Sequence, residues 1–155
     1  MAFVEIVRPL LRLVEESLQA PERPMRFMVI GDGGRLAATV VTPLSVVLTE
    51  LLQNAVDHGF PEGDGGGNVA VRLHVEETEL EIAVIDDGRG IPADFKLADA
   101  KGLGLSIVRT LVTTELAGTI EMRPAHAEEL AEVEFVPRDG NTGTVILLRV
   151  PLQSD

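Results

Sequence analysis

The sequence contains no cysteine, tryptophan or tyrosine, and only two of its 155 residues are lysines. Without cysteine the chain can form no disulfide and no thiolate metal site, which fits a reducing compartment and leads us to expect a cytoplasmic protein. Its only aromatic residues are five phenylalanines, so it offers little surface on which bases could stack. Its apolar runs are too short to cross a bilayer and no export signal opens the chain, so we expect no direct membrane contact.

Positive charge is also scarce, with 13 lysines and arginines against 25 aspartates and glutamates, for a net charge of −12. Such a chain repels a phosphate backbone, so we expect no nucleic-acid partner. A polyphosphate ligand would need strong local help, and both lysines, Lys96 and Lys101, lie within ten residues of each other. The length suits one globular domain, and 45% hydrophobic residues are enough to build its core.

Hydrophobic periodicity predicts an α+β fold. Spacings of three and four residues indicate helices, and alternation indicates strands. Helices are expected at 3–19, 42–56 and 103–116, and strands at 26–30, 36–41, 69–75, 80–84, 120–123 and 144–150. Successive parallel strands would need strict alternation with helices, so this order favours a two-layer α/β sandwich. We expect a mixed, mostly antiparallel sheet with helices on one face.

A polar stripe follows the second predicted helix. Glu50, Asn54 and His58 are spaced by four residues and therefore lie along one line of that helix, whose other positions are apolar. A carboxylate, an amide oxygen and an imidazole on one line suit a hard cation beside a phosphate. The plain alternative is an ordinary solvated face.

A second group of polar residues, Asp86-Asp87-Gly88-Arg89-Gly90, follows the strand predicted at 80–84. Asp86 continues the alternation of Leu80, Ile82 and Val84, so a carboxylate ends the buried face and needs hydrogen-bond donors. Gly88 and Gly90 allow the close approach of another backbone or a ligand. The same glycines fit a dinucleotide fingerprint, but two aspartates before them would repel a pyrophosphate, so we reject it. The alternative is a tight turn that Asp86 caps.

A third motif, Lys101-Gly102-Leu103-Gly104-Leu105, opens the helix predicted at 103–116. Backbone amides at a helix N-terminus favour anions, and glycines leave these amides open. A flexible entry into the helix is the alternative.

Together these motifs resemble those of the ATP-binding superfamily shared by histidine kinases, gyrase-type topoisomerases, a heat-shock chaperone and mismatch-repair ATPases, the GHKL superfamily with its Bergerat-type fold. Residues 50–58 are similar to its N box, 86–90 to its first glycine box and 102–105 to its second. Gly143-Thr144 resembles its closing element. The version of these motifs here looks most like the catalytic domain of a bacterial sensor histidine kinase.

The resemblance implies ATP and Mg²⁺ as ligands and a role for each matching residue. Asn54 would bind Mg²⁺, Glu50 would act as the catalytic group at the reacting phosphate, and His58 would contact phosphates. Asp86 would accept a hydrogen bond from the adenine amino group. The remaining implied nucleotide contacts are Gly88 and Gly90 at the base, Thr144 beside Asp86, and Lys101, Gly102, Leu103, Gly104 and Leu105 around the triphosphate.

The family also implies partners, namely a helical hairpin that carries the phosphoacceptor histidine and a response regulator downstream. No such histidine lies upstream of residue 44, so residues 1–24 are expected to lead out of a missing phosphoacceptor domain and residues 25–155 to form the catalytic domain. Ala100 and Lys101 replace residues usual in the second glycine box, and the acidic insert 128–139 has no family role. The alternatives are an anti-sigma-factor-type serine kinase and a nucleotide-sensing module without kinase activity.

Overall fold

A computed structural model of the chain describes residues 2–18, 24–60, 66–91, 103–136 and 140–152. Helices and strands follow one another in an order close to the one that periodicity predicts. The elements are α1 (Phe3–Leu18), β1 (Met25–Gly31), α2 (Ala38–Gly59), β2 (Gly67–Glu76), β3 (Glu79–Asp86), α3 (Leu103–Thr110), the π-helical turn η2 (Leu111–Glu115), β4 (Thr119–Pro124), α4 (Ala127–Glu132) and β5 (Thr144–Pro151).

The strands form one five-stranded mixed sheet in the order β1-β2-β3-β5-β4. Only β1 and β2 are parallel, and the other three pairs are antiparallel. The register places Asp86, at the end of β3, directly opposite Thr144, at the start of β5. Two residues that the sequence assigns to one site, 58 positions apart, are therefore neighbours across the sheet.

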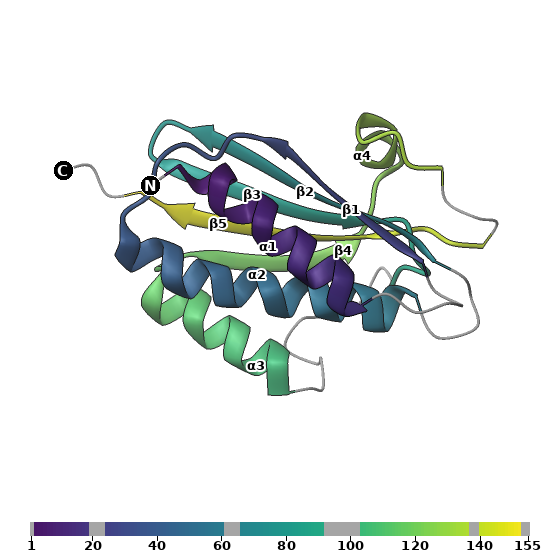
Figure 1. Ribbon diagram of the computed structural model, residues 1–155, viewed down its shortest axis with the longest axis horizontal. Helices are drawn as coiled ribbons and strands as arrows, with labels where there is room; N and C mark the ends of the chain where they lie inside the picture. Colours follow the sequence, from purple (N-terminus) through teal and green to yellow (C-terminus); the bar gives the residue numbers. More distant parts are fainter. Residues whose placement is uncertain (1, 19–23, 61–65, 92–102, 137–139, 153–155) are drawn as a thin grey trace.

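One face of the sheet carries α1, α2 and α3, which confirms the two-layer α+β architecture (Figure 1). The alternate residues Leu80, Ile82 and Val84 point into this core, as the alternation predicts. Helix α1 contributes four buried side chains to the same core: Phe3, Val7, Leu11 and Val14. The segment expected to lead out of another domain thus packs as part of this one, and a preceding domain stays a prediction.

The strand predicted at 36–41 is wrong. Helix α2 begins at Ala38, and Pro43 lies inside the helix instead of at its first position. The β-branched run Thr39-Val40-Val41 suggested a strand, but Val41 is buried on the same helix face as Leu44, so packing overrides local propensity. The partner of β1 is therefore β2, far along the chain, and not the residues that follow it.

The acidic insert 128–139 contains α4, which covers part of the opposite face of the sheet (Figure 1). Leu130, Val133 and Phe135 pack there on a second, smaller apolar cluster with residues from β2, β3 and β5. Arg123 and Glu129 fix the start of α4 through two hydrogen bonds of 2.7 and 2.8 Å. The apolar residues between the acidic ones thus give the insert a structural role.

Helix α2 is long and apolar enough, by length and composition alone, to span a membrane, and is the one such helix in the described ranges. This differs from the expectation that apolar runs are too short, because polar residues, among them the pairs Gln53-Asn54 and Asp57-His58, interrupt the apolar runs of the 22-residue helix. Nine of its residues are buried against the sheet and the neighbouring helices. That packing is typical of a core helix, since such helices meet the same test.

Candidate nucleotide-binding site

A small pocket lies between the C-terminal half of α2 and the ends of β3 and β5. Five of the residues predicted from the sequence line it together: Asn54, His58, Asp86, Gly90 and Thr144. Its remaining lining residues are Ala55, Gly59, Ile91, Met122 and Ile146. The fold thus brings the polar stripe of α2 and the end of β3 to one place, as the hypothesis of a shared site requires.

Asp86 is the buried acid of this pocket, with 2% of its surface exposed. Its Oδ1 accepts a 2.9 Å hydrogen bond from the Gly88 N–H, so Asp86 also caps its own turn. Burial raises the pKa of Asp86 to about 7, the backbone N–H groups of Gly88 and Thr144 lower it, and the neighbouring Asp87 raises it further. A carboxylate this deeply buried favours a ligand that donates hydrogen bonds.

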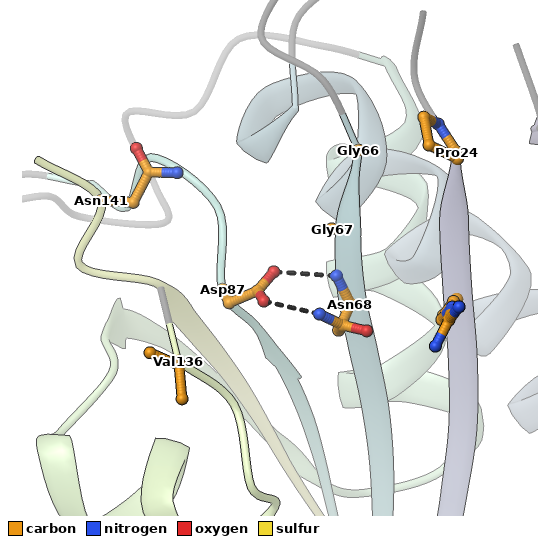
Figure 2. Close-up of a pocket in the computed structure, with 8 residues that line it drawn as sticks. Pro24, Gly66, Gly67, Asn68, Asp87, Val136 and Asn141 are labelled. Carbon is orange, nitrogen blue, oxygen red and sulfur yellow. Dashed lines mark hydrogen bonds between the residues drawn. The ribbon is translucent and has the colours of Figure 1, made fainter. Parts of the chain in front are cut away.

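Asp87 points toward Asn68 at the start of β2 (Figure 2). Its two oxygens accept from the backbone N–H and the side-chain amide of Asn68, both at 2.8 Å. Side chains alternate along a strand, so consecutive aspartates separate, one toward α2 and one into a hollow near the start of β2. Of the two acids, Asp86 alone is therefore placed for the nucleotide pocket.

The polar stripe on α2 is partly ordered by its own backbone. The Asn54 side-chain amide donates to the Glu50 carbonyl at 2.8 Å. This bond fixes which end of the amide faces outward, and it leaves Oδ1 available to a cation. His58 is exposed one turn later and lines the pocket with Asn54, whereas Glu50, half-buried one turn earlier, is not among the residues that line it.

Gly88 and Gly90 allow close contact between protein segments. A Cβ on Gly88 would lie 2.8 Å from the Gly59 Cα, and one on Gly90 would meet the Thr142 side chain. Gly90 also has a φ of +85°, a backbone conformation that residues with a side chain rarely adopt. Their missing Cβ atoms allow the end of α2 and the loop before β5 to come close, and Gly90 also lines the pocket, so the expected contact of these glycines with a base stays a prediction.

The second glycine motif is described only in part. Lys101 and Gly102 lie outside the described residues, while Leu103 and Gly104 open α3. The Leu105 side chain is buried in the main core with 5% exposure. The contact with the triphosphate that the resemblance implies for Leu105 would therefore come from its backbone.

Sequence reasoning missed the apolar walls of the pocket and the glycine behind Asp86. Met122 and Ile146 come from β4 and β5, and their alternation with outward residues was the available signal. Gly59 ends α2, and a Cβ there would lie 3.2 Å from Asp86 Oδ1. Gly143, at a φ of +75°, donates to the Gly88 carbonyl at 2.9 Å and holds the loop in place.

Residues 39–154, which include α2, the pocket and β5, match the family described as histidine kinase-, DNA gyrase B-, and HSP90-like ATPases. The chain belongs to this family. Members of this family bind ATP, so the chain is an ATP-binding domain.

Three relatives of this ATPase family show which branches the chain is similar to. The sensor histidine kinase PdtaS of Mycobacterium tuberculosis H37Rv is 36% identical over 96% of the chain, which spans only 26% of the length of PdtaS. The serine-protein kinase RsbW of Halalkalibacterium halodurans is 29% identical over 74% of the chain and 76% of its own length. The blue-light-activated histidine kinase EL346 of Erythrobacter litoralis has the same fold, with a TM-score of 0.76, 24% identity, and coverage of 98% of this chain and 42% of that one.

Proposed function

We propose that this chain is the catalytic domain of a protein-histidine kinase, which binds Mg²⁺ and ATP and phosphorylates a histidine on a separate phosphoacceptor domain. The observation that carries this proposal is the buried Asp86 carboxylate, which faces one pocket together with Asn54 and His58. The adenine amino group supplies the donor that suits this carboxylate. The α2 stripe then faces the phosphates.

Asn54 is the residue we propose to hold Mg²⁺. Its amide nitrogen is engaged by the Glu50 carbonyl, so its oxygen is the atom available to a cation. No group of three His, Asp or Glu among the described residues could hold a metal ion. One protein oxygen is nevertheless enough for Mg²⁺ when nucleotide phosphates and waters complete its shell, and the bound ion would neutralise charge on the phosphates.

In the proposed transfer, a ring nitrogen of the acceptor histidine forms a bond to the γ-phosphorus. The bond between this phosphorus and the β,γ-bridging oxygen breaks, and ADP leaves. Glu50 accepts the proton that the imidazole loses from its other nitrogen. Such transfer depends mainly on positioning and charge stabilisation, which suits a domain that holds the nucleotide and presents its last phosphate.

A serine kinase is the second candidate, because RsbW resembles the chain over most of its own length. The products separate the two proposals, since phosphohistidine is labile in acid and phosphoserine is stable. The test mixes the domain with radiolabelled ATP, Mg²⁺ and a separately produced phosphoacceptor hairpin of the full-length protein. Acid-labile label on the hairpin supports the histidine kinase, and acid-stable label supports the serine kinase. No label with intact ATP binding would indicate a nucleotide sensor.

Replacing Asn54 with alanine should mainly abolish the dependence of ATP binding on Mg²⁺, because it removes the proposed oxygen ligand. Calorimetric titrations of ATP with and without Mg²⁺ measure this dependence. Gln53→Ala is the matched control, since it removes an amide from an exposed position of the same helix. An Asn54 variant whose affinity still responds to Mg²⁺ as the parent protein does would contradict the ligand role.

The wider setting of the domain is part of the same proposal. We infer a cytoplasmic location from the absence of cysteine, and a response regulator as the next acceptor of the phosphoryl group. Residues 92–102, which hold both lysines, lie outside the described residues, and we propose that Lys101 and Gly102 wrap the triphosphate.

A further inference from the structure

Strand β1 forms one edge of the sheet and pairs with β2 alone. The Phe27 N–H points away from β2, because it donates to Glu15 Oε2 of α1 at 2.8 Å. Peptide groups alternate sides along a strand, so the N–H and C=O of Val29 point away from β2 as well. No hydrogen bond to another residue in the described ranges satisfies them. At Val29 this edge is therefore open to another strand.

The Glu15 carboxylate occupies part of this edge. It sits where the carbonyl oxygen of an added strand would accept the Phe27 N–H. An acidic oxygen therefore fits this position. The Glu15 side chain would have to move aside for a strand that pairs along β1.

Two hollows flank the β1 edge, one on each face of the sheet. On the helix face, Arg8, Leu11 and Arg12 of α1 line a hollow with Phe27, Met28 and Val29. On the opposite face, Val133 and Phe135 line another hollow with Arg26 and the same Phe27 and Met28. A strand added at this edge would send alternate side chains into the two hollows, which is how strand addition achieves specificity.

The hollow on the helix face differs in charge from the chain, because Arg8 and Arg12 line it against the single acid Glu15, whereas the other hollow holds Arg26 and Glu134. Arg8, Arg12 and Arg26 are exposed, and no ion pair within the described ranges engages them. Three arginines thus gather at one edge of a chain with a net charge of −12. The hollow on the helix face favours acidic side chains, and the hollow beside Val133 and Phe135 favours apolar ones.

We propose that the β1 edge is a docking site for an extended segment of a partner protein in which acidic and apolar residues alternate. The segment adds as a sixth strand beside β1, its backbone pairing with Phe27 and Val29. Its acidic side chains meet Arg8 and Arg12, while its apolar side chains enter the hollow beside Phe135. The site lies apart from the Asp86 pocket and does not depend on the kinase proposal.

The test uses a synthetic peptide of alternating glutamate and valine, labelled with a fluorophore, and measures binding to the whole chain by anisotropy. We expect saturable binding that weakens with salt, and none for a peptide of alternating lysine and valine. Hydrogen exchange followed by NMR should show protection of the Val29 amide when the peptide binds. Failure of the glutamate-valine peptide to bind, or binding that leaves the Val29 amide unprotected, overturns the proposal.

Variants at exposed positions of α1 locate the peptide. Exchanging both Arg8 and Arg12 for glutamine should weaken binding about tenfold, corresponding to about 1.4 kcal/mol. Arg109→Gln, at an exposed position of α3, is the control for the loss of positive charge and should have little effect on peptide binding. Glu15→Ala should tighten binding, because it frees the Phe27 N–H, and Glu16→Ala removes the same charge from a neighbouring exposed position. Equal effects of each variant and its control contradict the proposed site.

A second copy of the chain is the competing occupant of this edge. Pairing two β1 edges would bring together two chains of charge −12, which opposes association. Sedimentation of the chain should therefore give a monomer. A dimer that dissociates on replacement of Arg8 and Arg12 would assign the edge to self-association and overturn the proposal.

Discussion

Replacing Asp86 with asparagine should weaken the binding of adenosine and of ATP by more than tenfold. The single oxygen of an asparagine there can accept the Gly88 N–H, which then turns its NH₂ group toward the pocket. This NH₂ would face the adenine amino group, so two donors would meet without an acceptor. A buried unsatisfied polar group costs about 1–3 kcal/mol, and each 1.4 kcal/mol is a factor of about ten in affinity.

The pKa of Asp86 adds a dependence on pH with a definite sign. Burial raises this pKa to about 7, so at pH 6 most of the free protein carries the neutral acid. Since adenine requires the carboxylate, affinity for adenosine should rise about tenfold between pH 6 and pH 8. Adenosine is the ligand of choice because it has no phosphate that titrates in this range.

The stability of the unliganded protein should change with pH in the opposite direction. The folded pKa of Asp86 lies above its ordinary value of 3.8, so its contribution to stability is complete below pH 3.8 and is lost as pH rises through about 7. Asp86→Asn should remove this loss in urea unfolding measured at pH 5 and pH 8. Affinity that rises with pH and stability that falls with pH are together specific to a buried acid that binds as its anion.

Asp87→Asn is the matched control for Asp86→Asn. It makes the same change one residue later, where Asp87 binds Asn68 (Figure 2). At pH 8, where Asp86 is ionised with or without the charge of Asp87, this change should leave adenosine affinity within about twofold. It should lower stability, since a hydrogen bond to a charged group contributes about 1.5–3 kcal/mol net. Asp86→Asn with unaltered adenosine affinity would remove Asp86 from the site.

The sequence alone predicted the parts of the site that depend on local periodicity. Alternation along β3 placed Asp86 on the buried face, and the four-residue spacing placed Asn54 and His58 on one side of α2. Both rules follow from backbone geometry, which local sequence determines. The prediction of a strand at 36–41 was wrong because β-branched residues locally favour a strand. The helix forms there because Val41 packs in the core, which the local sequence does not indicate.

Features that depend on contacts between distant segments could not be predicted in the same way. The role of the acidic insert rests on Leu130 and Phe135 meeting β3 and β5, and no local pattern specifies that contact. The open edge of β1 likewise depends on β1 pairing with β2 and not with its nearest neighbour in sequence. The closeness of Gly59 to Asp86, 27 residues later, also depends on how the end of α2 packs against β3.

Replacing Gly88 with alanine should impair both the nucleotide site and the stability of the fold. The new Cβ would lie 2.8 Å from the Cα and the carbonyl carbon of Gly59. These are backbone atoms at the end of α2, which cannot rotate aside as a flexible side chain could. Two hydrogen bonds hold the segments together, from Arg89 N–H to the Gly59 carbonyl at 3.0 Å and from Gly143 N–H to the Gly88 carbonyl at 2.9 Å.

Relief of this clash must move either α2 or the loop that carries Asp86, so stability and nucleotide affinity should fall together. Overpacking typically costs about 1–3 kcal/mol, and we expect the upper end of that range with at least tenfold weaker ATP binding. Urea unfolding and calorimetric titration measure the two losses. Gly140→Ala is the control: its φ of +88° imposes backbone strain of about 1–2 kcal/mol, but its Cβ meets nothing within 4 Å. It should therefore cost stability without affecting affinity, and a Gly88→Ala protein that behaves like it would show that the contact between Gly88 and Gly59 does not shape the nucleotide site.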